Sequence, residues 1–190
     1  MAFNLYQGMP FIPYKIIQYL ALNNENIWKI LKYDDYDCLS KPNLTLAEKM
    51  DLVWNRQGNQ EDYNVFFTQL VENSILESTT ILKIYKIITT PRDSIHGVAG
   101  YEFDILYGGK IALINYDGIP CNRGDVMESE ILQTLNGADV GGVGLLQFNA
   151  KLTSMSRSNL NLGNSKTFTG TSLIMGVELI DVGGDGESCQ

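Results

Sequence analysis

Residues 166–182 alternate between two sets of side chains, and this pattern constrains the fold more than any other feature of the sequence. A period of two sustained over so many positions is typical of a long β-strand. One set is Thr167, Thr169, Thr171, Leu173, Met175, Val177 and Leu179, and the other is Phe168, Gly170, Ser172, Ile174, Gly176 and Glu178. One end of this strand is too polar to be core on either face. We therefore expect a long C-terminal β-hairpin that projects from the domain and offers an unpaired edge to another subunit.

The first half of the chain has the period of helices instead. Apolar residues recur at helical spacing in residues 14–22, 25–33 and 45–54. The third helix has the clearest start, because Thr45 followed by Glu48 three residues later forms a capping box. Its expected buried residues are Leu46, Met50, Val53 and Trp54.

The period changes at residue 79, where β-branched and aromatic residues become frequent. Residues 79–90 and 98–107 are predicted to pair as strands, and 111–116 to add a third strand after the Gly108-Gly109 turn. A helix then begins at Asn122, a good N-cap, and ends at Asn136-Gly137, followed by a strand over 145–152.

These patterns predict an α+β fold: a small mixed or antiparallel β-sheet flanked by helices, with an N-terminal helical part and a long projecting C-terminal β-hairpin. We divide the chain into an N-terminal arm at 1–12, a helical part at 13–78, an α+β core with the hairpin at 79–182, and a flexible acidic tail at 183–190.

Composition disfavours several classes of partner. The formal net charge of −8 opposes general binding to DNA or to anionic lipid. No run of residues approaches a membrane span, and the first residues do not resemble a signal peptide. Three cysteines, an odd number without a CxxC pair, fit free thiols in a reducing cytoplasm.

The sequence contains no convincing catalytic, cofactor or metal motif. The single histidine, His96, stands in an expected turn, and Cys121 has no histidine near it in the sequence. The acidic run at 34–37 and the acidic tail do not match a calcium loop in ligand order. The glycines at 141–144 precede a strand and offer no helix N-terminus to a phosphate. We therefore expect a protein that is not an enzyme and that holds no cofactor or metal.

Apolar residues outside the expected core point to contacts with other subunits. The first twelve residues of the chain are rich in apolar and aromatic side chains, which are costly to leave in water. The expected interface residues are Phe3, Tyr6 and Phe11 in this arm, and Phe168, Gly170, Leu173 and Met175 in the hairpin.

The order of elements resembles that of the neck proteins of tailed bacteriophages, which include stopper, head-completion and tail-terminator proteins. The similarity lies in the hairpin opening with ILKIYKI, the helix NRGDVMESEILQTLNG, the strand GVGLLQFN and the closing FTGTSLIMGVEL. The resemblance implies a virion protein, made in the host bacterial cytoplasm, that forms a ring of six or twelve copies between portal and tail. Its neighbours would be portal or adaptor and tail proteins, and DNA would pass through its channel without sequence-specific binding.

Two other classes remain open at this point. One is a cytoplasmic adaptor or binding module, which a stable monomer with a single conventional interface would identify. The other is a small enzyme, which a deep pocket around His96 would identify.

Overall fold

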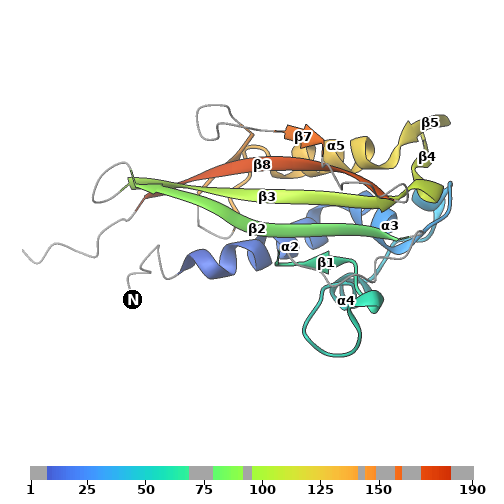
Figure 1. Cartoon of the computed structure of the whole chain (residues 1–190), viewed down its shortest axis with the longest axis horizontal. Coiled ribbons are helices and arrows are strands. Elements are labelled where there is room, and N and C mark those ends of the chain that lie inside the picture. Colours follow the sequence, from blue (N-terminus) through green and yellow to red (C-terminus); the bar gives the residue numbers. More distant parts are fainter. Residues whose placement is uncertain are drawn as a thin grey trace, which may run out of the picture.

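The computed structural model describes residues 8–68, 79–91, 96–140, 144–148, 157–159 and 168–180. A helical N-terminal part leads into a long twisted sheet, and one further helix packs on that sheet (Figure 1). The helical part consists of η1 (Met9–Phe11), α2 (Ile12–Asn23), α3 (Asn26–Lys32), η2 (Cys38–Ser40), α4 (Leu46–Asp51) and η3 (Gln60–Asp62).

The main sheet is mixed, with strand order β1-β2-β3-β8-β6, and β7 also pairs with β8. Its strands are β1 (Val65–Phe66), β2 (Thr80–Pro91), β3 (His96–Gly108), β6 (Leu146–Gln147), β7 (Arg157–Asn159) and β8 (Phe168–Ile180). Among the described strand pairs of this sheet, the β1–β2 pair is parallel and the others are antiparallel. The predicted α+β class, with a mixed sheet and a helical N-terminal part, is confirmed.

The C-terminal strand differs from the prediction. β8 pairs with β3 over its whole length, from Gly108–Phe168 to His96–Ile180, and so lies inside the main sheet. β6 and β7 pair with parts of its other edge. The antiparallel pairing of β6 with β8 is that of the predicted C-terminal hairpin, but the expectation that the hairpin stands apart from the sheet with an unpaired edge is wrong for the described residues. The alternating pattern identified the strand correctly, but it carries no information about which strands lie beside it.

The strand predicted at 111–116 is present over Leu113–Tyr116, but its predicted place in the main sheet is wrong. β4 (Leu113–Tyr116) pairs with β5 (Ile119–Asn122) in a separate two-stranded sheet, and the short helix η4 (Gly109–Ile111) precedes it. The turn that joins β4 to β5 is Asp117-Gly118, with positive φ angles of 52° and 83°. This is the type I′ geometry that hairpins favour. The Asp-Gly pair, and not Gly108-Gly109, is therefore the hairpin signal in this region.

The capping signals placed two helices correctly. The side chain of Thr45 accepts a hydrogen bond from the Glu48 amide, and Glu48 reaches back to the Thr45 amide, so α4 starts with a complete capping box. Helix α5 (Arg123–Leu135) starts at Asn122, whose side chain accepts from the amides of Gly124 and Asp125. Gly137 follows its end with φ +82°, as a left-handed cap requires.

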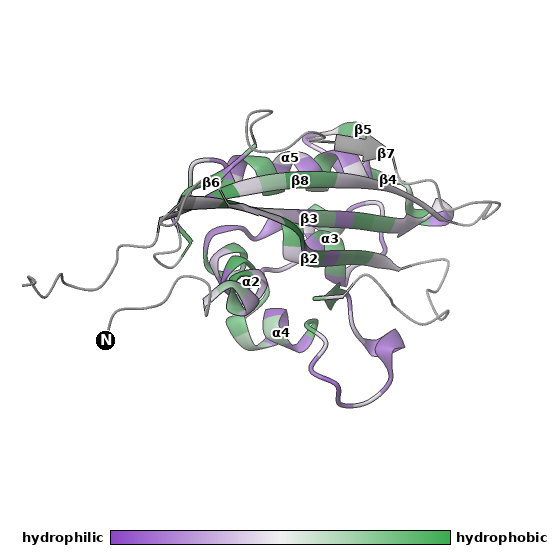
Figure 2. Ribbon diagram, turned by 60° about the vertical axis from the view of Figure 1, so that its left-hand side comes forward, coloured by the Kyte–Doolittle hydropathy of each residue, from purple (hydrophilic) through white to green (hydrophobic). Residues whose placement is uncertain are grey.

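One hydrophobic core joins the helical part to the sheet. It contains Ile16, Ile17 and Leu20 of α2 and Trp28 of α3 together with Tyr101 of β3, all fully buried. Figure 2 shows hydrophobic bands along β2, β3 and β8 and along α2 and α5. Burial of each large apolar side chain contributes about 1.5–3 kcal/mol. The helical part and the strands thus stabilise each other in the conformation described.

Candidate functional site

The structure separates the predicted interface residues into two groups. Phe11 is exposed, with 60% of its surface accessible. Leu173 and Met175 are fully buried in the chain's own core, and Gly170 is buried as well. The prediction that Leu173 and Met175 contact another subunit is therefore not supported, because their side chains face the helices of the same chain. Phe3, Tyr6 and the side chain of Phe168 lie outside the described residues.

Phe11 belongs to an exposed, uncharged stripe along α2, which we call the α2 stripe. Its members are Phe11, Tyr14, Gln18 and Leu22, which are all exposed. Successive members are three or four residues apart, so they lie on one side of the helix. The opposite side of α2 carries the buried core residues. Leu22, a possible core residue by its spacing, is 71% exposed, so the helix offers apolar side chains on both of its faces.

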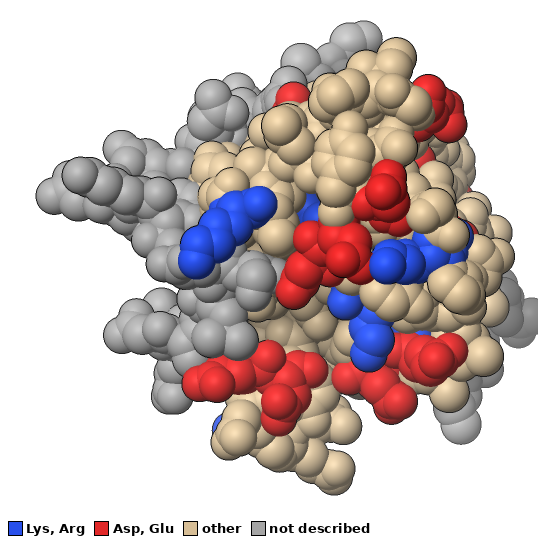
Figure 3. All heavy atoms as spheres, turned by 90° about the vertical axis from the view of Figure 1, so that its right-hand side faces the viewer, with Lys and Arg blue, Asp and Glu red and all other residues tan. Residues whose placement is uncertain are grey.

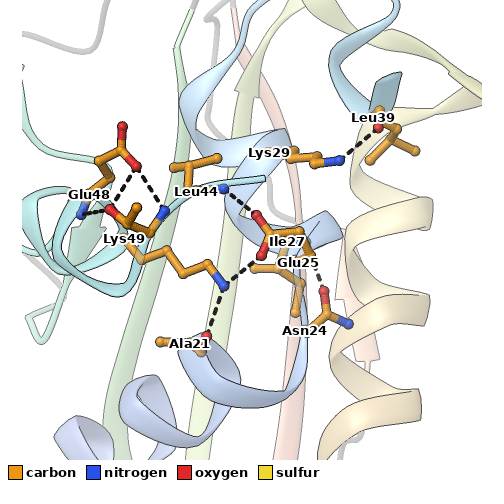
Figure 4. Close-up of polar contacts among 10 residues, drawn as sticks. Ala21, Asn24, Glu25, Ile27, Lys29, Leu39, Leu44, Glu48 and Lys49 are labelled. Atoms are coloured by element: carbon orange, nitrogen blue, oxygen red, sulfur yellow. Dashed lines mark hydrogen bonds and ion pairs between the residues drawn. The ribbon is translucent and has the colours of Figure 1, made fainter. Parts of the chain in front are cut away.

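A buried ion pair fixes α2 relative to α3 and α4 (Figure 4). The Lys49 ammonium lies 2.7 Å from the Glu25 carboxylate and donates at 2.9 Å to the carbonyl of Ala21, near the C-terminal end of α2. The same carboxylate accepts from the amide of Leu44 at 2.6 Å. A cation at the end of a helix complements its dipole. These contacts tie three segments together, and the α2 stripe is therefore held on a defined scaffold.

A second exposed apolar group lies on the β4–β5 hairpin. Leu113 and Ile119 are 55% and 62% exposed, and Tyr36 beside the hairpin is 45% exposed. The hairpin is fixed to the loop that contains Tyr36, because the Asn115 amide donates to the Tyr36 carbonyl at 2.8 Å and the Asn115 side chain donates to Asp37 at 2.9 Å. The strand register places Leu113 and Ile119 on opposite faces of the hairpin, since Ile119 pairs with Tyr116 and Leu113 pairs with Asn122.

Three acidic residues lie near the β4–β5 hairpin. Asp35 and Asp37 lie in the loop beside it, and Asp117 is in its turn; all three are exposed. Asp35 forms an ion pair with Lys41 at 2.7 Å. Figure 3 shows this end of the molecule, where acidic side chains form several clusters with basic side chains between them.

Arg123 holds this end of the molecule together from inside. Its guanidinium is fully buried at the start of α5. Nε donates to the carbonyl of Ile111 at 2.7 Å, and Nη1 donates to the carbonyls of Ile30 and Tyr33 at 2.9 and 3.0 Å. The guanidinium also donates to the Thr80 hydroxyl at 3.1 Å and to the Asp35 carbonyl at 3.2 Å. Burial lowers the pKa of Arg123, which expresses the cost of removing the charge from water.

Two carboxyl groups meet on the sheet face opposite the helices. Tyr85 donates to Asp104 at 2.8 Å, and Ser172 donates to Glu102. The second oxygen of Asp104 is buried without a hydrogen-bond partner among the described residues. Burial raises the pKa of Asp104 and of Tyr85, and it lowers the pKa of Lys83, which lies opposite Asp104 in the sheet. This cluster lies in the middle of three strands, and we interpret it as a structural polar network.

Comparison with known proteins bears on what these surfaces are for. The family model for YomW matches residues 24–177, which is most of the chain. The chain belongs to the YomW family. YomW is a phage-associated family, so the coarser part of the sequence interpretation, a bacteriophage protein, is supported. No curated protein and no solved structure gives a significant match.

Within the part of this YomW-family chain that the structure describes, His96 and Cys121 are not brought together into a site. His96 begins β3 and pairs with Ile180, so its backbone lies in the sheet and not in the expected turn. Cys121 lies in β5 as a partly buried free thiol. Within the described ranges, no group of three or more histidine, cysteine or acidic side chains is placed to hold a metal ion. No described helix is long and apolar enough to cross a membrane.

Sequence reasoning missed the structural role of Arg123 and the β4–β5 hairpin. In the sequence, Arg123 in the first turn of a helix has the appearance of an exposed charged residue. Its partners are mostly backbone carbonyls from distant segments, which the sequence does not identify. The hairpin was missed because residues 111–116 were assigned to the main sheet. The Asp117-Gly118 pair was the signal that would have identified the hairpin.

Proposed function

We propose that this YomW-family protein is a virion structural protein of a tailed phage. In this proposal it forms a ring in the neck between portal and tail, where it closes the head or terminates the tail and surrounds the DNA channel. Its role is structural and not enzymatic. Portal or adaptor proteins on one side and tail proteins on the other are its neighbours.

The α2 stripe is the observation that carries the proposal. Three of its four residues are large and apolar or aromatic, and Phe11 and Leu22 expose well over half of their surfaces. Scattered exposed apolar residues are ordinary, whereas a row of them along one helix marks a contact site. The side chain of Gln18 is polar but uncharged, so it adds little desolvation cost to such a contact.

The charge of the protein supports a channel that DNA crosses freely. The net charge of −8 repels phosphates, and a ring multiplies that charge by its copy number. A protein of this kind lets a duplex slide past without holding it. Membership in a phage-associated family supports the same setting.

The first test is the mass of the purified protein over a wide concentration range, measured by light scattering with negative-stain images of the same samples. We expect a closed ring of six or twelve copies with an opening of roughly 20–40 Å, wide enough for a DNA duplex. A monomer at every concentration contradicts self-assembly and favours the adaptor alternative.

The second test removes the gene from the phage that encodes it. A neck protein is needed to join finished heads to finished tails, so we expect DNA-containing or leaking heads and separate tails in the lysate. Intact, infectious virions from the deletion contradict a neck role, whatever the solution mass of the protein.

A further inference from the structure

We propose that residues 1–7 of one copy of this chain add as a strand to the outer edge of β2 in the neighbouring copy. This inference rests on the proposed ring, and it names a backbone contact that would link the subunits. We call residues 1–7 the N-terminal segment, and the outer edge of β2 over residues 85–91 the free edge.

The free edge has no neighbouring strand in the part of the chain that the structure describes. β3 pairs with the inner edge of β2 from Thr80 to Pro91. β1 lies on the outer edge, where its two residues pair with Leu82 and Lys83. No described strand other than β1 and β3 pairs with β2. The outward amides and carbonyls of the free edge are thus placed to take up one more strand.

The side chains of the free edge add an apolar surface to this unpaired backbone. Ile87 and Ile88 are 37% and 49% exposed. The strand register shifts between Lys86 and Ile88, and both isoleucines reach over Gly100, where an added Cβ would lie 2.8 Å from Ile88 and 3.5 Å from Ile87. Gly100 alternates with the core residue Tyr101, so the isoleucines lie on the sheet face that points away from the helices.

The N-terminal segment matches the free edge in length and in character. Seven residues span about 23 Å as a strand, and the free edge has the same number of residues. The sequence MAFNLYQ has no charged side chain, and Phe3 and Leu5 share one face at strand spacing. A strand added with this face outward places Phe3 and Leu5 beside Ile87 and Ile88 and covers their exposed surface.

The start of α2 favours a neighbouring copy over the same copy. Gly8 has helical φ and ψ angles of −78° and −20°, and η1 continues directly into α2. Figure 1 shows α2 starting toward the end of the sheet where β2 ends and running back beneath the sheet. To reach its own free edge, the N-terminal segment would have to reverse direction within its seven residues, which leaves fewer of them to pair.

A neighbouring copy can accept the segment at its full length. Each copy then gives one segment and accepts one, and this head-to-tail contact closes into a ring when the rotation between subunits allows.

The test uses the full chain with its native N-terminus and three variants. The deletion variant lacks residues 2–7, Ile88→Lys adds a charge to the free edge, and Leu145→Lys is the matched control. Ile88 is 49% exposed and Leu145 is 48% exposed, so the two lysines are introduced at equally exposed positions. Circular dichroism melting curves confirm that each variant is folded before its mass is measured.

Light scattering over a range of concentrations measures the effect on assembly. We expect the deletion variant to remain a monomer and Ile88→Lys to need about ten times more protein than the wild type to form the ring. The Leu145→Lys control should assemble as the wild type does. A folded deletion variant that forms the ring at the wild-type concentration overturns the proposal, as does an Ile88→Lys variant that assembles like the control.

Hydrogen–deuterium exchange shows where the segment binds. In the wild-type ring, the amides of residues 85–90 should exchange about ten times more slowly than in the deletion variant, because a new strand takes up the outward amides. Equal exchange rates overturn the proposal. Slow exchange that is already present in dilute wild-type monomer and is lost in the deletion variant shows pairing within one copy, which also overturns it.

The outcomes separate this inference from the proposed function. A ring that survives the loss of residues 2–7 contradicts the strand contact and leaves the ring standing. A wild-type protein that remains monomeric at every concentration contradicts the ring, and the strand contact fails with it.

Discussion

The sharpest prediction concerns Arg123, which connects α3, the loop after it, η4, β2 and α5 from a fully buried position. Arg123→Met keeps much of the apolar length of the side chain and removes the guanidinium. The carbonyls of Ile30, Tyr33 and Ile111 then lose the charged donor that they share. Since these carbonyls are held inside the fold, water replaces that donor only if the structure opens.

The magnitude follows from the number and the kind of bonds. Five hydrogen bonds to a charged donor, at about 1.5–3 kcal/mol each, amount to roughly 8–15 kcal/mol before the cost of burying the charge. That burial costs several kcal/mol, in agreement with the lowered pKa of Arg123. The expected net loss is about 3–5 kcal/mol, which is a large part of a typical total of about 5–15 kcal/mol.

Urea unfolding followed by circular dichroism measures this loss. With a slope of about 2 kcal/mol per molar, the midpoint should fall by about 2 M in Arg123→Met. Arg123→Lys is the matched control, because it keeps the charge but has three donors on one nitrogen in place of the planar fork. We expect the lysine variant to lose roughly half as much stability. A loss below about 1 kcal/mol in the methionine variant refutes the role given to Arg123.

Three further substitutions test separate parts of the structure. Asp104→Asn should raise the melting temperature at pH 7 and have little effect near pH 3. The pKa of Asp104 is raised in the folded state, so the wild type loses stability as the pH rises through that pKa. Identical melting curves for the wild type and the variant at both pH values would contradict this. Gly124→Ala places a Cβ 2.5 Å from the Tyr107 ring, so we expect the free energy of unfolding from urea titration to fall by about 1–3 kcal/mol. An unchanged urea midpoint would show that the ring moves aside without loss of stability. Asn122→Ala removes the N-cap of α5, which should cost about 1–2 kcal/mol, while Asn122→Asp should keep most of that stability.

Local signals in the sequence were sufficient where the structure is determined by neighbouring residues. The Thr45–Glu48 capping box and the Asn122 cap each fixed the start of a helix, because cap and amides lie within four residues of one another. The alternation in residues 166–182 similarly identified β8. At the two helix starts the contacts that decide the conformation are already present in a short peptide, whereas in β8 only the alternation of the two faces is local.

Features that depend on distant contacts were not predictable. The alternation in β8 defines two faces, but which face is covered depends on the helices that pack there, so Leu173 and Met175 were assigned to an interface although they are core. Nothing near Leu46 indicated that it would be 52% exposed at the start of α4, since its helical spacing also fits a buried stripe. The fold class therefore followed from the sequence, and the candidate surfaces required the structure.

The pairing of β3 with β8 has a consequence for how the chain is made. His96 pairs with Ile180 and Gly108 with Phe168, so the two strands are far apart along the sequence. During translation, β3 leaves the ribosome long before β8 is synthesised, so one edge of β3 has no partner strand during that time. Contacts between such distant segments form slowly, and unpaired edges favour aggregation. Nascent chains that wait together on one messenger RNA are thus exposed to mispairing with one another, and a host chaperone that shields β3 during synthesis would raise the yield of folded protein.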